Sequence, residues 1–439
     1  MVFLHLRMIT QLNVYDATMA RFKMIFDHFE YVYVSFSGGK DSGLLLNMAI
    51  EYIRKYAPGR RLGVFHMDYE IQYRHTTEYV QRTWEQNSDI LDIYHCCIPF
   101  KVSTCTSMYQ DFWRPWDPKM KDLWVRELPR NAYTEKDFSF YTQGQRDYDF
   151  QFLFATWLRV KKNYSNVCCL VGIRTQESIN RWRTIHSDNN YRHWQGCKWT
   201  REIDKQVYNA YPIYDWETED VWAAYGKFGW DYNRLYDLYW KAGIPLARQR
   251  VASPFISEAI SYLGVYRAID PDTWGKMISR VNGVNFSGIY GNTTAMGWRS
   301  INCPPGKTWK EYMYFLLDTL PDEIRNNYLS KLEVSRRFWR TKGGVLADET
   351  IQKLRDAGIE FTIGKDTSYK TNKKPVMMEY IDDIDIPEFR EIPSYKRMCI
   401  CILKNDHACK YMGFAITKKE KEMRERVMKK YKALKNGRI

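Results

Sequence analysis

The chain has 439 residues, of which 45% are hydrophobic and 16% aromatic, so it is rich enough in core-forming side chains to exclude wholesale disorder. Its net charge of +14 favours an anionic partner such as a nucleotide, a nucleic acid or an acidic protein. The first twenty residues lack the features of a secretory signal, and no run of about 18 apolar residues predicts a membrane span. We therefore expect a cytoplasmic protein whose ten cysteines are reduced thiols.

Strand and helix patterns alternate along the first half of the chain. Runs of β-branched and aromatic residues predict four strands, at residues 31–36, 61–70, 167–174 and 208–216. Apolar residues at helical spacing follow the first and the last of these runs. This alternation predicts an α/β fold with a doubly wound, mostly parallel sheet. Because such sheets bind ligands at the carboxyl ends of their strands, we expect SFSGGKDS, HMDYE and VGIRTQES to meet in one site.

Two domains are expected. Residues 1–300 form a nucleotide-binding domain, within which residues 100–150, dense in Trp, Tyr, Pro and charge, form an inserted, loop-rich cover over the site. Residues 301–439 form a mainly helical C-terminal domain with a basic tail, in which residues 418–439 carry ten Lys and Arg against three Glu. The tail is either the solvated face of a helix or a contact to DNA or RNA phosphates.

The stretch SFSGGKDS, residues 35–42, places a glycine turn between a predicted strand and a predicted helix. The two glycines allow backbone N–H groups to point inward, and the N-terminus of the helix adds the positive end of its dipole. Lys40 adds a positive charge, and Asp41 either holds Mg²⁺ or caps the helix. The spacing is not that of a Walker loop. The candidate phosphate-binding residues are Ser37, Gly38, Gly39, Lys40, Asp41 and Ser42.

SGGKDS resembles the PP-loop of N-type ATP pyrophosphatases, which cleave ATP between the α and β phosphates. VGIRTQESINR, residues 171–181, and the segment at 211–245 resemble motifs of the sulfonucleotide (phosphoadenylylsulfate, PAPS) reductase family. The resemblance implies a fold like that of the adenine nucleotide alpha-hydrolases and an adenine nucleotide as ligand. It also implies that Asp68 lies near the nucleotide and that Gly172, Arg174 and Arg181 face its anionic part. Catalytic roles are then expected for Lys40, Asp41 and Arg174.

Segments of the C-terminal half, GGVLADE and ICILKNDHACKYMGF, are similar to the branch typified by the immunoglobulin-binding regulator A proteins of enterobacteria and their phage relatives. That resemblance implies a ParB-like partner protein.

True reduction of PAPS needs a nucleophilic cysteine in an E-C-G-[IL]-H motif, which this sequence lacks, and no C-x-x-C is present. We therefore expect Mg²⁺-assisted cleavage of ATP or a related nucleotide at the α-phosphate, as in adenylyl transfer. Two alternatives stay open: a catalytically silent, nucleotide-sensing regulator associated with DNA, and a PAPS reductase.

Four metal-type ligands, Cys399, Cys401, His407 and Cys409, lie within eleven residues. Their spacing is compatible with a small Zn²⁺ site, although it is not that of a standard zinc finger. The segment ICIL also predicts a strand in which Cys399 and Cys401 are buried on one side, and we favour this structural interpretation. The histidines at positions 66, 75, 186 and 193 are interpreted as isolated polar residues rather than catalytic bases.

Overall fold

The computed structural model describes residues 12–186, 192–251, 253–257, 259–291, 293, 296, 301–364 and 373–412. The basic tail at 418–439 lies outside the described residues, so its contact with nucleic acid stays a prediction. Within the described ranges, no helix combines the length and the apolar character needed to cross a bilayer.

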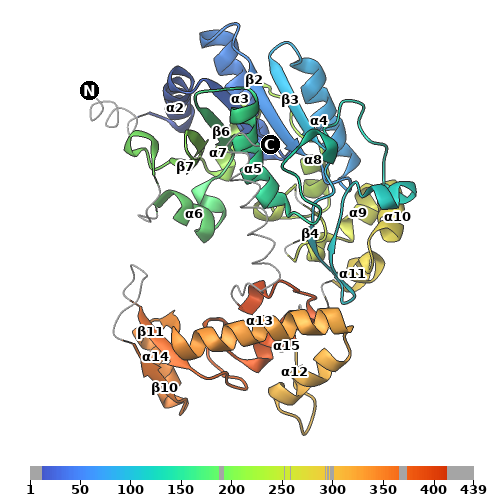
Figure 1. Ribbon diagram of the computed structural model, residues 1–439, viewed down its shortest axis with the longest axis vertical. Coiled ribbons are helices and arrows are strands. Elements are labelled where there is room, and N and C mark those ends of the chain that lie inside the picture. Colours follow the sequence, from blue (N-terminus) through green and yellow to red (C-terminus); the bar gives the residue numbers. More distant parts are fainter. Residues whose placement is uncertain are drawn as a thin grey trace.

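A six-stranded sheet in the order β3-β2-β1-β6-β8-β7 forms the centre of the larger domain (Figure 1). Only β7 runs antiparallel to its neighbour; the other pairs are parallel. The chain moves outward from β1 through β2 to β3 and then returns to β6 on the other side of β1. The strands are β1 (Tyr31–Ser35), β2 (Leu62–Met67), β3 (Leu91–Cys96), β6 (Val167–Val171), β7 (Thr200–Asp204) and β8 (Val207–Ala210).

Helices cover both faces of this sheet, which confirms the predicted doubly wound α/β class. Val32 and Val34 of β1 belong to the core on one face, whereas Tyr31 and Tyr33 belong to the core on the other. The first face is covered by α2 (Val14–His28), α3 (Lys40–Tyr56), α4 (Arg74–Gln86) and α7 (Thr218–Phe228), and the second by α5 (Asp147–Lys161). All four predicted strands are present; β3 and the antiparallel edge strand β7 were not predicted.

The inserted segment, residues 100–150, contains the hairpin of β4 (Val102–Ser107) and β5 (Gln110–Trp113). Beyond the hairpin, the backbone N–H groups of Trp116 and Val125 donate to the buried carboxylate of Glu70, at 2.7 and 3.2 Å. These contacts place the insert over the carboxyl ends of β2 and β3, whereas the expected phosphate loop follows β1.

The helices α8 (Leu235–Lys241), α9 (Val265–Ile269), α10 (Pro271–Arg280) and α11 (Val284–Tyr290) complete the larger domain, and their buried residues join the core that contains α5. A separate core begins at Trp309. It holds α12 (Trp309–Asp318), α13 (Asp322–Thr341), α14 (Asp348–Asp356), α15 (Tyr395–Leu403) and a sheet of β9 (Gly344–Leu346), β10 (Phe361–Ile363) and β11 (Lys374–Met378). The helical C-terminal region is confirmed, and the small sheet is an addition to it.

The prediction of a strand at ICIL is wrong, because these residues belong to helix α15. Ser394 caps this helix by accepting a hydrogen bond from the Arg397 N–H. Its residues Met398 to Ile402 are all buried. The segment therefore lacks both the alternation of apolar and polar residues that marks a half-buried strand and the one-sided apolar pattern that marks a surface helix.

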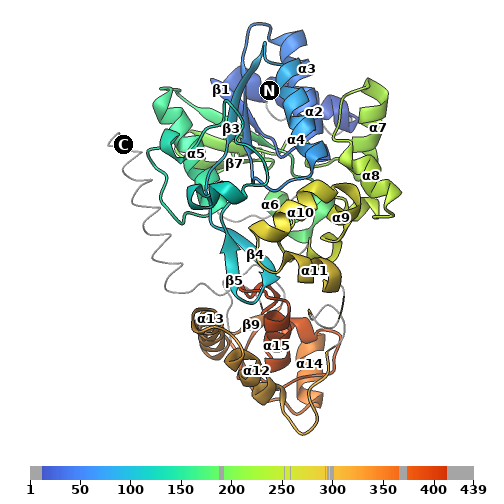
Figure 2. The ribbon, with the colours of Figure 1, turned by 90° about the vertical axis from the view of Figure 1, so that its right-hand side faces the viewer.

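The hairpin of β4 and β5 extends from the larger domain to the C-terminal one (Figure 2). At its tip, the carbonyl of Ser107 accepts a hydrogen bond from the His407 ring at 2.8 Å. The Asn405 amide donates to the carbonyl of Cys105 at 3.5 Å. The insert is therefore part of the larger domain and also forms hydrogen bonds with the C-terminal domain.

We predict that Arg280→Ala destabilises the larger domain by about 3–5 kcal/mol, because it leaves the buried Glu70 carboxylate without its cationic partner. The Arg280 guanidinium contacts both Glu70 oxygens, at 2.8 and 2.9 Å, and the two side chains are only 4% and 0% exposed. Urea denaturation followed by tryptophan fluorescence measures the loss. Arg54→Ala, which removes an exposed ion pair with Asp89, is the matched control and should cost less than about 1 kcal/mol. Equal losses in the two variants would contradict this role of Glu70 and Arg280.

Candidate functional site

The loops after β1 and β6 lie side by side at the point where the strand order reverses. A Cβ atom added to Gly172, just after β6, would stand 3.1 Å from the backbone of Asp41 and Ser42. A larger residue would require the β6 loop or the first turn of α3 to shift by a few tenths of an ångström. Topological switch points of this kind are where doubly wound sheets bind their ligands.

The phosphate loop, residues 37–42, has the geometry that its sequence predicts. Gly38 adopts the left-handed conformation, with φ of 76°, and α3 begins at Lys40 with Gly39 as its N-cap. The N-cap, Gly39, has no side chain that could cap this helix N-terminus. The Lys40 N–H bonds to Tyr236, so the N–H groups of Asp41 and Ser42 in the first turn are the ones left for an anion. The hydroxyls of Ser37 and Ser42 stand 3.0 Å apart across the loop.

Three side chains from a later segment hold the loop in place. The Tyr236 hydroxyl accepts a hydrogen bond from the Lys40 N–H at 3.0 Å, and the Tyr225 hydroxyl donates to the Lys40 carbonyl at 2.7 Å. The Asn233 amide donates to the Gly38 carbonyl at 3.0 Å. Sequence reasoning assigned no role to these residues, although all three lie in the segment at 211–245 that carries the resemblance to the reductase family.

Asp41 lies between two cations. One of its carboxylate oxygens pairs with the Lys40 ammonium at 3.0 Å and the other with the Arg174 guanidinium at 2.7 Å. Arg174 is only 1% exposed and also lies 3.6 Å from Glu177, which in turn pairs with Arg181. The structure thus brings the expected residues of the loop together with Gly172, Arg174 and Arg181.

A further cation, Arg250, adds its field to this cluster, and sequence reasoning missed it. Burial lowers the pKa of Lys40; Asp41 opposes this shift, whereas Arg174 and Arg250 reinforce it. Burial likewise lowers the pKa of Arg181, and Arg250 again contributes. Lys40, Arg174 and Arg181 therefore pair with two carboxylates, those of Asp41 and Glu177, and Arg250 adds a fourth positive charge nearby. The positive excess suits an anion.

Asp68 follows β2 as expected, but its carboxylate does not contact the phosphate loop. Its partners are the His95 ring, at 2.7 Å, and the Arg126 guanidinium. Burial alone raises the pKa of Asp68, yet Arg126 and His95 bring that pKa well below its ordinary value. That Asp68 lies near the nucleotide therefore stays a prediction from the family resemblance.

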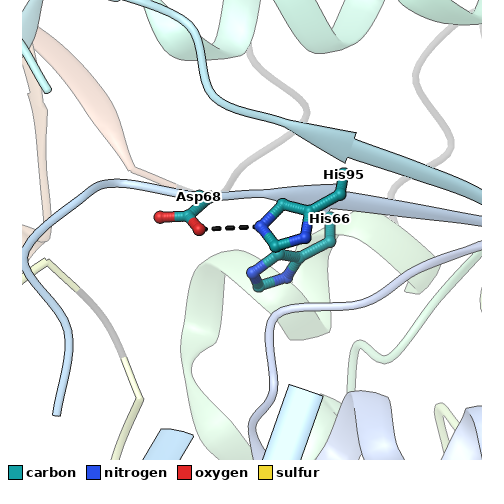
Figure 3. A group of neighbouring side chains, drawn as sticks. All are labelled: His66, Asp68 and His95. Carbon is teal, nitrogen blue, oxygen red and sulfur yellow. Dashed lines mark hydrogen bonds and ion pairs between the residues drawn. The ribbon is translucent and has the colours of Figure 1, made fainter. Parts of the chain in front are cut away.

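The histidine at position 66 is not isolated, contrary to its interpretation from sequence. His66, Asp68 and His95 lie together at the ends of β2 and β3, with one potential ligand atom from each within 4.8 Å of the others (Figure 3). Burial and the neighbouring His95 lower the pKa of His66 to about 4. Sequence reasoning missed this group because β3, which carries His95, was not recognised as a strand.

Three of the four expected zinc ligands of the C-terminal domain contact other groups. The Cys399 thiol lies 3.5 Å from the Trp309 carbonyl, the Cys401 thiol lies 3.8 Å from Asp406, and the His407 ring contacts Ser107. Among the described residues they do not form a group of metal ligands, so the zinc hypothesis finds no support. Cys399, Cys401 and Cys409 are buried, in accord with the structural interpretation.

Two family models match the chain. The phosphoadenosine phosphosulfate reductase domain matches residues 31–243, which include the central sheet, the phosphate loop and Arg174. A domain of unknown function, DUF3440, matches residues 243–423. Their common boundary at 243 precedes the predicted domain boundary at 300. In the structure, α9 to α11, which follow residue 243, still pack into the larger domain.

Two solved structures show distant likeness. The PAPS reductase of Candida auris is 15% identical, with a TM-score of 0.29 over 53% of this chain and 87% of that one. The FMN adenylyltransferase of Candida glabrata is 13% identical, with a TM-score of 0.30 over 51% of this chain and 57% of that one. Likenesses this weak say nothing about the activity of this chain.

A full-length relative is far more similar. The uncharacterized protein YbdN of Escherichia coli (strain K12) is 32% identical over 418 residues, which cover 94% of this chain and 93% of YbdN. The chain therefore belongs to the same family as YbdN.

Proposed function

We propose that the chain binds ATP or a related adenine nucleotide through its phosphates at the phosphate loop and cleaves it at the α-phosphate. The observation that carries this proposal is the cation cluster around Asp41 at the switch point of the sheet. An uncapped helix N-terminus and an excess of positive charge converge there, and this combination suits a chain of phosphates better than a neutral ligand.

The residues of the chain act on such a ligand mainly by electrostatics. The N–H groups of Asp41 and Ser42, in the first turn of α3, hold phosphate oxygens, while Lys40 and Arg174 offset the negative charge that develops on the departing pyrophosphate. Arg181 and Arg250 extend the positive field on the side of the β6 loop. In this proposal the group that accepts the nucleotidyl moiety is a second substrate.

Asp41 does not fit the expected role of a resident Mg²⁺ ligand. Each of its carboxylate oxygens already pairs with a cation, and Glu177 nearby is paired with Arg181. Mg²⁺ takes oxygen ligands, and neither oxygen of Asp41 is left without a cationic partner. In the proposed reaction, Mg²⁺ therefore arrives as part of the nucleotide substrate and is not held by the protein beforehand.

The reductase alternative lacks a suitable thiol. Nine of the ten cysteines, all of which lie in the described ranges, are buried, and the tenth, Cys303, belongs to the C-terminal domain. Burial raises the pKa of the Cys168 and Cys169 thiols, to about 12 for Cys169. A nucleophilic thiol needs the opposite shift, toward the thiolate.

We predict that, with water in place of the second substrate, the protein converts ATP to AMP and pyrophosphate in the presence of Mg²⁺. Lys40→Ala should reduce the rate by about 100-fold or more, because a charge that offsets the leaving group is lost. Lys55→Ala, at the exposed opposite end of α3, is the matched control and should retain the rate. The assay is run with and without DNA and the ParB-like partner, whose involvement is part of the proposal.

ATP that binds without pyrophosphate release under all of these conditions would overturn the proposed cleavage and favour the nucleotide-sensing regulator. Release of sulfite from PAPS in the presence of thioredoxin would instead favour the reductase.

A second prediction concerns the close approach of the two loops. Gly172→Ala places a methyl group 3.1 Å from the backbone of Asp41 and Ser42, so the first turn of α3 must move. We expect a cost of about 1–3 kcal/mol, divided between domain stability and nucleotide affinity. Denaturation and calorimetric titration with ATP measure the two parts. Gly226→Ala in α7, where the new methyl meets open space, is the control. If both variants behave alike, the contact at Gly172 does not position the loop.

A further inference from the structure

His66, Asp68 and His95 present a set of metal-type ligands on one side of the central sheet (Figure 3). His66 belongs to β2, Asp68 follows that strand, and His95 belongs to the adjacent strand β3, where it pairs in register with His66. Parallel strands in register hold side chains of the same parity next to one another. The rigid sheet, rather than a loop, therefore sets the spacing of the two imidazoles.

The imidazole of His66 is oriented as a metal ligand. Its Nδ1–H donates a hydrogen bond to the carbonyl of Phe36 at 2.8 Å. The other ring nitrogen, Nε2, is then unprotonated and can give its lone pair to a metal ion. A backbone carbonyl that fixes one ring nitrogen of a histidine is the usual support for a metal bond at the other. Phe36 directly precedes the phosphate loop, so His66 is anchored to the strand end that also positions the loop.

Asp68 and His95 complete the set. Arg126 pairs with one oxygen of Asp68 and leaves the other facing the His95 Nε2 at 2.7 Å. A metal ion bound to both atoms displaces the proton between them and widens this distance to about 3 Å, as metal–ligand bonds of about 2.0–2.2 Å require. The proton of His95 then lies on Nδ1. This nitrogen now accepts a long hydrogen bond of 3.4 Å from the Trp84 indole N–H, and that bond is lost when Nδ1 carries the proton.

The open side of this group faces a pocket of about 490 Å³. Its other walls come from α4, through residues such as Glu78, Gln81 and Arg82, and from Arg126 and Pro129 of the insert. None of the lining residues belongs to the phosphate loop at 37–42. Three protein ligands beside a pocket leave coordination positions open to water or to a small molecule.

We propose that His66, Asp68 and His95 form a binding site for one divalent transition-metal ion, distinct from the nucleotide site. Two imidazoles and a carboxylate suit Zn²⁺, Fe²⁺, Mn²⁺ or Co²⁺, whereas Mg²⁺ and Ca²⁺ prefer ligand sets made of oxygen alone. The donor set thus separates this site from any Mg²⁺ that accompanies the nucleotide.

Titration of the chelator-treated full-length chain with Zn²⁺ by calorimetry, and with Co²⁺ by visible absorption, tests this site. We expect one tight equivalent of Zn²⁺, Co²⁺ bands that report nitrogen and oxygen ligands without a thiolate band, and no comparable binding of Mg²⁺. His66→Gln and His95→Gln should each weaken binding by more than the roughly 10–100-fold that changes outside the ligand set cost. His186→Gln, which alters an exposed histidine, should leave binding unchanged.

A structural reading of the same group makes opposite predictions. If these residues form only a buried network of ion pairs, Zn²⁺ will not bind tightly or raise the thermal unfolding midpoint of the wild type, and the proposal fails. It fails equally if tight Zn²⁺ binding survives in both His66→Gln and His95→Gln, or if the Co²⁺ complex shows a thiolate band that Cys401→Ser abolishes. Circular dichroism of each variant shows whether it is folded. Because His66 bonds to the backbone carbonyl of Phe36, the amide of the glutamine in His66→Gln offers that carbonyl a polar partner.

Discussion

The close approach of the β6 loop to the first turn of α3 is the constraint on which the rest of the site depends. Gly172 lets the two backbones meet, and this contact places Arg174 against Asp41. Asp41 then holds Lys40 and Arg174 together, although like charges would otherwise repel them in a buried setting. Glu177 adds a second carboxylate, which pairs with Arg174 and Arg181.

The two candidate sites of the larger domain use neighbouring strand ends for different chemistry. The ends of β1 and β6 carry cations and an uncapped helix, which suit phosphate. The ends of β2 and β3 carry imidazoles and a carboxylate, which suit a transition metal. Phe36 connects them, since its carbonyl orients His66 and its chain neighbour begins the phosphate loop. The insert closes the second site through Arg126 and continues to the C-terminal domain.

The phosphate loop could be predicted because all of its residues are contiguous, and Arg174 and Arg181 because they lie in one short motif. Tyr225, Arg250 and His95 could not, because they reach their sites from elements remote in sequence. The strand β3 alternates polar and apolar residues only weakly, which hid His95. The error at ICIL arose because a short, wholly apolar run fits a buried helix as well as a buried strand.

Equilibrium binding of ATP, AMP and pyrophosphate, measured by calorimetry on the wild type and on Arg174→Gln, tests most directly whether the cation cluster recognises a chain of phosphates. The account predicts that pyrophosphate competes with ATP, that AMP binds at least about tenfold more weakly, and that Arg174→Gln removes most of this difference. AMP binding as tightly as ATP, with no competition from pyrophosphate, would show that the cluster does not hold phosphates and would contradict the account.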